Sequence, residues 1–326
     1  MGCLGWSRAD RGGSLAFPIY IMTGPALPSA EHQPVLLDAV LQYLAPAPGG
    51  RYCDATVGLG GHAHVVMERS SPDGRLIGLD RDRQALQTAA VRLASFGDRV
   101  SLIHAPFSQV GKVLNELGAI PIDGFVVDLG VSSPQLDTAE RGFSFQRSGP
   151  LDMRMDQSRG ETVADLLLRI DEIELGRILR EYGEERYAAR IARAILQARD
   201  RGELSSTGAL GALVARALPH HERHKNPATR TFQALRIAVN QELTELEQFL
   251  DQMADCLRPG GRICIIAFHS LEDRIVKHRL RQMAARNGPA PPKLRLLTKH
   301  VVVADEAERL ANPRSRSAKL RAAERI

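Results

Sequence analysis

Short apolar runs alternate with amphipathic stretches through the first 130 residues or so of the chain. The runs at 51–57, 75–80, 100–105 and 124–129 have strand character, and the segments between them, such as 82–95, place apolar residues at helical spacing. Strands that alternate with helices predict a parallel, doubly wound sheet. The fold class is therefore α/β.

This alternation stops between about residue 137 and residue 226, where the sequence contains no convincing strand. Four segments rich in Ala, Leu, Ile and Arg predict helices at 161–169, 173–182, 186–199 and 206–217. We therefore expect an all-helical insertion in the sheet domain. Such an insertion typically covers the ligand edge of the sheet and selects the substrate.

After this helical block the sheet pattern resumes. Apolar residues spaced by three and four predict one long amphipathic helix over 235–257, an Arg-Pro-Gly-Gly turn follows, and 262–268 predicts a fifth strand. Ser270 and the acids after it match a helix capping box. Residues 293–303 can supply the last, antiparallel strands.

These patterns predict a domain organisation of three parts. Residues 31–137 and 227–326 form the sheet domain, and residues 138–226 form the helical insertion. We expect residues 1–30 to be a disordered extension, or translation to begin at Met22, since the apolar run that would suggest a targeting signal is short and interrupted by Pro18. No run approaches the roughly 18 apolar residues of a membrane span.

Charge is unevenly distributed along the chain. Residues 270–326 contain 14 Lys and Arg against 6 Asp and Glu, which leaves 29 against 32 for the rest. A basic C-terminal region favours a polyanionic partner, with a solvated helical face as the alternative. The segment NPRSRSAKLRAAER, residues 312–325, is too polar for a core, and we expect it to contact backbone phosphates.

The cysteines indicate buried thiols rather than a metal site. Cys53 and Cys264 lie in apolar strand-like runs, and the four cysteines show no Cys-x-x-Cys spacing. We predict a reducing, cytoplasmic location and no metal.

A glycine-rich turn follows the first predicted strand, in the pattern Asp54-x-x-x-Gly58-x-Gly60-Gly61. Glycines permit positive φ and a close approach of a ligand, and the helix that follows offers free N–H groups to an anion. The pattern excludes a P-loop and does not match a full dinucleotide fingerprint. Tight packing alone is the alternative explanation.

Two aspartates end later strands. Asp80 lies about twenty residues after the glycine turn, where a doubly wound fold places an acid on a ribose. Asp128 ends the fourth predicted strand. Helix capping is the alternative for each, although Asp82 is better placed than Asp80 as a cap, and the sequence after Asp128 does not begin an obvious helix.

The glycine turn with these acids resembles a class I S-adenosylmethionine-dependent methyltransferase, a Rossmann-like fold, with a nicotinamide-dependent oxidoreductase as the rival. The resemblance becomes close through strings that occur together and in order, which are HQPVLL at 32–37, DLGVSSPQLD at 128–137, RGFSF at 141–145, GPLDMRMD at 149–156, NPATRTFQALRIAVNQEL at 226–243, FHSLEDR at 268–274 and NPRSRSAKLR at 312–321. From about residue 31 to its end, the chain resembles the bacterial small-subunit ribosomal RNA cytosine-N4 methyltransferases, the MraW (RsmH) family.

This resemblance implies methylation of the exocyclic N4 amine of one cytidine in the decoding region of 16S rRNA, with S-adenosylmethionine as the methyl donor. It implies 16S rRNA within the small ribosomal subunit as the partner, no membrane, and leaves a homodimer open. The cofactor contacts that it implies are Gly60, Gly61, His62, Asp80, Phe107, Asp128 and Gln135. On its own, His62 is compatible with an ordinary first-turn helix residue and Phe107 with a core residue.

A hypothesis for the chemistry centres on Ser132-Ser133-Pro134-Gln135, which takes the place of the Asp/Asn/Ser-Pro-Pro-aromatic motif of other amino-methyltransferases. Ser133 or the backbone carbonyls around Pro134, with Asp128, would accept hydrogen bonds from the amine; Ser132 or Ser133 as a mere turn former is the alternative. Gln135 stands where those enzymes have an aromatic residue.

Four residues are candidates for RNA contact. Phe143 or Phe145 could stack on the base, Arg141 could meet phosphate, and Arg230 could guide the RNA. The cluster His220, His221 and His224 is interpreted as a solvated basic loop rather than a metal site. Two other functions remain open: methylation of another RNA or DNA cytosine or of a small molecule, and a catalytically inactive RNA-binding scaffold.

Overall fold

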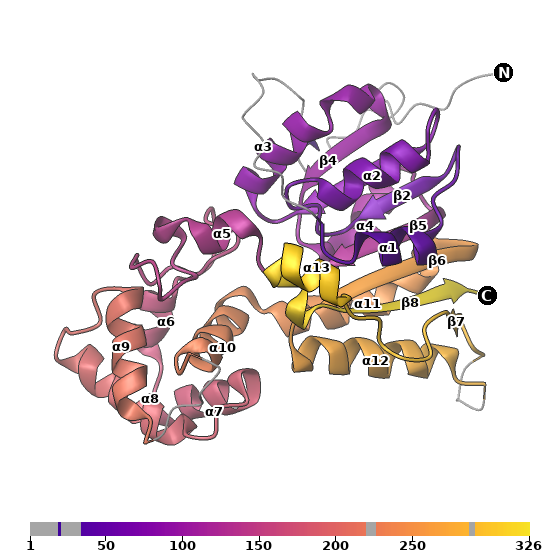
Figure 1. Cartoon of the computed structure of the whole chain (residues 1–326). Coiled ribbons are helices and arrows are strands. Elements are labelled where there is room, and N and C mark those ends of the chain that lie inside the picture. Colours follow the sequence, from indigo (N-terminus) through magenta and orange to yellow (C-terminus); the bar gives the residue numbers. More distant parts are fainter. Residues whose placement is uncertain (1–18, 21–33, 220–225, 287–290) are drawn as a thin grey trace. The chain divides into compact units, whose positions relative to one another are not determined.

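The computed structural model describes residues 19–20, 34–219, 226–286 and 291–326 (Figure 1). These residues form two compact units. Unit 1 comprises the chain up to Gly130 together with Thr244–Ile326, and unit 2 comprises Val131–Leu243. Unit 2 thus begins before, and ends after, the predicted insertion at 138–226. The predicted N-terminal extension lies outside the described residues, except for the two-residue strand β1 (Ile19–Tyr20).

Unit 1 contains an eight-stranded sheet with the order β1-β4-β3-β2-β5-β6-β8-β7. The strands after β1 are β2 (Arg51–Asp54), β3 (Arg75–Asp80), β4 (Val100–His104), β5 (Ile122–Asp128), β6 (Leu257–Ala267), β7 (Leu294–Leu296) and β8 (Lys319–Arg325). Strands β2 to β6 pair in parallel, and β8 runs antiparallel to both β6 and β7. Numbered without β1, the order is 3-2-1-4-5-7-6, which is that of the Rossmann-like methyltransferase fold. The predicted fold class is confirmed.

Helices cover both faces of this sheet. One face packs against α1 (Leu37–Leu44), α2 (Gly61–Arg69) and α3 (Arg83–Arg92). The other packs against α4 (Val110–Glu116), α11 (Glu242–Cys256) and α12 (Ser270–Ala284). Side chains alternate between the two layers along each strand, as a pleated strand buried on both faces requires.

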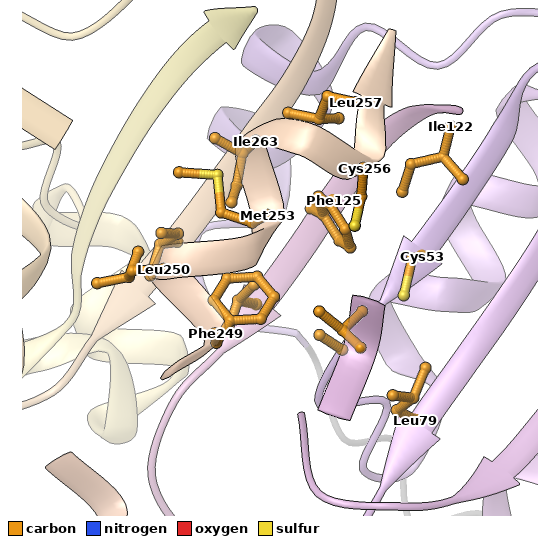
Figure 2. Packing of buried hydrophobic residues seen from close by; sticks show 14 of the residues in the cluster. Cys53, Leu79, Ile122, Phe125, Phe249, Leu250, Met253, Cys256, Leu257 and Ile263 are labelled. Carbon is orange, nitrogen blue, oxygen red and sulfur yellow. The ribbon is translucent and has the colours of Figure 1, made fainter. Parts of the chain in front are cut away.

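Figure 2 shows the second of these layers, in which strand residues meet α11. Phe125 of β5 and Phe249 of α11 pack edge to face with ring centroids 5.5 Å apart. Cys53 and Cys256 are buried free thiols in the same cluster. Aromatic and aliphatic burial of this kind is the main source of stability in such a core.

The polar C-terminal segment departs from the prediction. Residues 319–325 form β8, which lies between β6 and β7, and Leu320, Ala322 and Ala323 are fully buried. The prediction that this segment is too polar for the core is therefore wrong for β8. Its charged side chains instead pair with charges on neighbouring elements, since Arg321 pairs with Asp273 of α12 at 2.7 Å and Glu324 pairs with Arg262 of β6 at 3.1 Å.

Unit 2 is helical, as predicted. Its helices are α5 (Ser133–Asp137), α6 (Val163–Arg169), α7 (Glu172–Gly183), α8 (Ala188–Asp200), α9 (Thr207–Ala217) and α10 (Thr229–Asn240). Their apolar faces enclose a core of their own. Asn240 ties α10 to the segment before α6, since its side chain accepts a hydrogen bond from the Met155 N–H (2.8 Å) and donates one to the Met153 carbonyl (2.7 Å).

Three local predictions need correction. The predicted helix 235–257 is interrupted at Gln241, which has a φ of +52° and separates α10 from α11. A short helix, α5, does follow Asp128. The cap of α12 is His269, not Ser270, with Glu272 as the reciprocal partner. Local side chains and backbone conformation set where these helices begin and end, whereas apolar spacing only indicates a helix over several turns.

Candidate active site

The carboxyl edge of the parallel sheet gathers three aspartates. Strand β2 ends at Asp54, β3 at Asp80 and β5 at Asp128. These strands are neighbours in the sheet and run in parallel, so their final residues lie at one edge. In doubly wound sheets ligands bind outside this edge.

The glycine turn lies between Asp54 and α2. Gly58 has a φ of +50° and Gly60 a φ of +79°, both in the left-handed region that favours glycine. A Cβ at Gly60 would lie 3.3 Å from Leu93 Cδ1 and 3.4 Å from Ala89 Cα, so the backbone also packs closely against α3. The turn therefore requires glycine both for its conformation and for its packing.

Helix α2 begins at this turn with its first amides available. Its N-cap is Gly60, which has no side chain, and no side-chain oxygen among the described residues caps it. The first N–H groups of a helix have no partner within the helix, and they carry the positive end of its dipole. This helix start is therefore suited to an anionic group such as a carboxylate.

Asp80 fixes the shape of the turn. Its Oδ2 accepts a hydrogen bond from the Gly58 N–H, and its Oδ1 accepts one from the Asp82 N–H, both at 2.8 Å. Burial raises the pKa of Asp80 to about 6, against the lowering effect of these two hydrogen bonds. Asp82, not Asp80, caps α3 by accepting from the Gln84 N–H at 3.0 Å, which confirms the predicted cap.

His62 lies on the first turn of α2 beside Asp128. Its Nε2 is 3.6 Å from Asp128 Oδ2, and the side chain is buried. Neither His62 nitrogen nor Asp128 Oδ1 has a hydrogen-bond partner in the described part of the chain. Burial works to lower the pKa of His62, but the carboxylate of Asp128 and the negative charges of Asp54 and Glu308 outweigh it, so this pKa lies above its ordinary value.

Sequence reasoning missed the roles of Asp54 and Thr56. Asp54 is buried, and burial raises its pKa to about 7 even though the charge of His62 and a hydrogen bond from the Thr56 N–H lower it. Thr56 Oγ1 accepts a hydrogen bond from the Asp128 N–H at 2.7 Å. The turn pattern contains Asp54, and an acid at the end of a strand is itself a signal of a site residue. The hydrogen bond between Thr56 and Asp128 depends on the pairing of β2 with β5, which the sequence does not show.

Phe107 begins the 3-10 turn after β4. Its ring packs edge to face on Phe249 with centroids 5.7 Å apart, and the side chain is half-buried. One part of the ring therefore belongs to the core, and the rest is accessible at the carboxyl end of β4.

In unit 2, the segment after Val131 forms α5 through a capping box. Gln135 Oε1 accepts a hydrogen bond from the Ser132 N–H at 2.9 Å, and the Ser132 side chain faces the start of the helix in return. Ser132 therefore caps the start of α5, which agrees with its alternative interpretation as a residue that only shapes the backbone. Ser133 differs, because its Oγ is buried and has no hydrogen-bond partner among the described residues. Pro134 is exposed.

Two candidate RNA residues lie in the interior of unit 2. Arg141 is only 3 % exposed, and its Nη2 donates to the carbonyls of Arg154 (3.1 Å) and Met155 (2.9 Å). Phe143 is buried in the helical core. A buried guanidinium that bonds to carbonyls holds a loop, so the structure favours a structural role for both residues over contact with phosphate or base.

The other two candidates are more accessible. Phe145 is half-buried, and its ring packs edge to face on Phe232 with centroids 5.1 Å apart. Arg230 lies on the first turn of α10 and is half-exposed. The cluster His220, His221 and His224 lies outside the described residues.

Within the described ranges, every helix is too short or too polar to cross a lipid bilayer.

Comparison with known proteins identifies the family. Residues 29–326 match the MraW methylase family. The ribosomal RNA small subunit methyltransferase H of Pelobacter propionicus is 54% identical over 309 residues, which cover 91% of this chain and 99% of that protein. The proteins of the same name from Geobacter sulfurreducens (52% over 309 residues, 91% and 99%) and Nitratidesulfovibrio vulgaris (51% over 318 residues, 94% and 98%) are similar to the same extent. The chain belongs to the MraW methylase family.

Proposed function

We propose that the protein transfers a methyl group from S-adenosylmethionine to the exocyclic N4 amine of a cytidine in the decoding region of small-subunit ribosomal RNA. The observation that carries this proposal is a match to one methylase family along residues 29–326, with relatives at 51–54% identity that are named as ribosomal RNA small subunit methyltransferases. The carboxyl edge of the sheet in unit 1 supplies the chemistry that such a reaction needs.

The residues at this edge fit the methyl donor. S-adenosylmethionine carries a positive sulfonium and an ammonium group, and strands β2, β3 and β5 each end on an aspartate. The unpartnered Asp128 Oδ1 is suited to the ammonium group, and the uncapped start of α2 at Gly60 and Gly61 is suited to the carboxylate. Asp80 retains lone pairs for ribose hydroxyls, and Phe107 offers a ring face to adenine.

His62 and Asp54 set the charge of this site rather than contact the base. The raised pKa of His62 favours an imidazolium beside Asp128, and the pKa of Asp54, raised to about 7, favours its neutral form below that pH. Together they limit the repulsion that three adjacent carboxylates would otherwise produce. Gln135 is kept as a cofactor contact in this proposal, although its Oε1 is engaged in the cap of α5.

Methyl transfer to this amine depends on acceptors for its N–H groups, because the nitrogen lone pair is delocalised into the ring. The donor supplies an electrophilic methyl group on sulfur. The unpartnered Ser133 Oγ is suited to accept a hydrogen bond from the amine. Asp128 is assigned to the ammonium group of the donor and lies beside His62, so the proton that the nitrogen loses after the transfer passes to water. The Pro134 carbonyl already accepts a hydrogen bond from the Thr138 N–H at 2.9 Å, so it has only its second lone pair for the amine. Alignment of the two reactants can contribute roughly 7–11 kcal/mol.

The alternatives differ in what they would require. A catalytically inactive RNA-binding scaffold needs neither the left-handed glycines nor the three aspartates, and all of these are present. Methylation of another cytosine or of a small molecule would use the same donor site. Of the four RNA candidates, Phe145 and Arg230 remain accessible and are kept.

The test is incubation of the protein and labelled S-adenosylmethionine with small ribosomal subunits that lack cytosine-N4 methylation. Nucleoside mass spectrometry identifies the product, and nuclease mapping locates it. We expect N4-methylcytidine at one decoding-region position. Cofactor binding without any transfer would exclude this substrate. Transfer only to deproteinised RNA would show that the substrate is free ribosomal RNA and not the assembled subunit.

A further inference from the structure

Helix α12 presents an all-basic face to solvent. Arg274, Lys277, His278 and Arg281 lie at positions i, i+3, i+4 and i+7, which places them on one side of the helix. Arg274, His278 and Arg281 are exposed and Lys277 is half-exposed. The opposite side of the helix packs on the core through Val276 and Leu280. We call these four residues the α12 stripe.

The acids near the α12 stripe are already engaged. Glu272 is buried, and its Oε2 accepts a hydrogen bond from the Phe268 N–H at 2.9 Å. Asp273 pairs with Arg321 at 2.7 Å and with Lys319 at 3.8 Å. On the flank of the helix, Arg279 is paired with Asp251 of α11. In the described part of the chain, no carboxylate pairs with Lys277, His278 or Arg281, so the positive charge of these three residues remains available to a partner.

The topology of unit 1 sets where the α12 stripe begins and which way it runs relative to the candidate active site. Strand β6 runs parallel to β5, and α12 begins three residues after β6 ends at Ala267. The helix therefore starts at the same carboxyl edge as Asp54, Asp80 and Asp128, and it returns along the sheet beside β7 and β8 (Figure 1). With a rise of about 1.5 Å per residue, Arg274 and Arg281 lie about 10 Å apart along the axis. The stripe thus leads away from the candidate active site.

We propose that the α12 stripe binds the phosphate backbone of the RNA segment that continues from the methylated base. This inference rests on the proposed function and names a surface for its substrate. The residues are Lys, Arg and His without aromatic side chains, a composition that neutralises phosphates and does not read bases. We therefore expect the stripe to contribute affinity and salt dependence rather than sequence preference.

The experiment compares two variants that lose the same charge. The test variant carries Lys277→Gln and Arg281→Gln. The control carries Arg51→Gln and Arg69→Gln, at the first residue of β2 and the last residue of α2, both exposed and at the opposite edge of the sheet. Gln is a good helix former, so α12 is expected to persist; thermal melting and S-adenosylmethionine affinity check that each variant is intact.

The readout is the affinity for an unmodified transcript of small-subunit ribosomal RNA over a range of KCl concentrations. For the test variant we expect a roughly tenfold or greater loss of affinity at about 0.1 M salt and a slope of log K against log salt that is smaller by about 1.4, since each phosphate contact to single-stranded RNA contributes about 0.7. We expect the control to keep the wild-type slope.

Two results would overturn the inference. Equal affinities and slopes for the two variants would show a merely solvated face. Unchanged binding to the transcript with lost binding to assembled subunits would assign the stripe to an acidic protein surface instead. A failure of the proposed function would look different: the wild-type protein would then bind the transcript in a stripe-dependent way and transfer no methyl group to undermethylated subunits.

Discussion

The raised pKa values of Asp54 and Asp80 predict that binding of the methyl donor depends on pH. Burial raises their pKa values from 3.8 to about 7 and about 6. A raised carboxyl pKa means that the folded state favours the protonated form. The stability that these groups contribute is therefore fully present below about pH 4 and is lost as pH rises through about 6 to 7. A cationic ligand has the opposite preference, since it favours the ionised carboxylates.

We therefore expect the affinity for S-adenosylmethionine to rise from about pH 5 to about pH 8, while the free energy of unfolding of the unliganded protein falls over the same interval. Calorimetric titration in buffers of different ionisation enthalpy measures both the affinity and the protons released on binding. Asp54→Asn should flatten the upper part of the profile, near pH 7, and leave the part near pH 6 that Asp80 produces. An affinity that does not change with pH would contradict this account.

Ser133 provides a second prediction for a single side chain. Its buried Oγ has no hydrogen-bond partner among the described residues, so Ser133→Ala should leave folding almost unchanged. If Oγ accepts a hydrogen bond from the amine in the transition state, its loss costs about 1.5–3 kcal/mol, or roughly a ten- to hundredfold fall in kcat. Single-turnover methylation and S-adenosylmethionine binding separate the two effects.

Ser132→Ala is the matched control for Ser133→Ala. Ser132 forms the capping box of α5 with Gln135, so its removal should cost about 1 kcal/mol of stability and affect turnover only through that loss. Full turnover in Ser133→Ala would exclude Ser133 from the mechanism.

At the level of single residues, sequence reasoning identified positions better than environments. Asp82 was assigned to capping because it immediately precedes a helical pattern, and Asp80 and Asp128 were identified because they end strands. Arg141 and Phe143 were placed at the RNA because their residue types suit it. The burial of Arg141 depends on the carbonyls of Arg154 and Met155, and that of Phe143 on the helical core, and no local pattern reveals either.

Among the elements, the turn between β2 and α2 is the most sensitive. Gly60→Ala forces a Cβ into a left-handed conformation, which costs about 1–2 kcal/mol, and places it 3.3 Å from Leu93 Cδ1. We expect lower stability and weaker methyl-donor binding, because the first amides of α2 must move. Denaturant unfolding and calorimetric titration measure the two effects.

Gly176→Ala within α7 is the control for Gly60→Ala. A Cβ there would meet only Ala189 Cα at 4.0 Å, so this change should stabilise the protein by about 0.5–1 kcal/mol. Equal and small effects of the two substitutions would show that the conformation of the glycine turn is not required.

Elements were predictable where one periodicity persisted. Strand β3 has the predicted bounds, Arg75–Asp80, because an apolar run is closed on both sides by polar residues. The pattern does not reveal the break at Gln241, since apolar spacing continues across it. It does not reveal β8 either, because the buried Leu320, Ala322 and Ala323 stand among charged residues that pair with α12 and β6. Pairing partners distant in sequence decide the case of β8.

For the whole molecule, the division into two units predicts separable functions. Within the described ranges, all eight strands and the three strand-ending aspartates belong to unit 1, and each unit has its own hydrophobic core. We propose that unit 1 binds the methyl donor and that unit 2 selects the RNA. Replacement of Val131–Leu243 by a flexible Gly/Ser linker should then leave a folded protein that binds S-adenosylmethionine and methylates no RNA.

Gln135 makes this prediction quantitative. It lies in unit 2 and is a proposed cofactor contact, so the shortened protein should bind S-adenosylmethionine more weakly than the full chain, by the same factor as Gln135→Ala does in the full chain. Calorimetric titration of both proteins makes the comparison, and circular dichroism checks that the shortened protein is folded. If the shortened protein is folded but binds no cofactor, while Gln135→Ala binds it well, unit 2 contributes to the donor site through other residues, and the division of labour between the units is wrong. Equal affinities in the two proteins would support that division, because the sheet edge of Asp54, Asp80 and Asp128 then suffices for the rest of the donor.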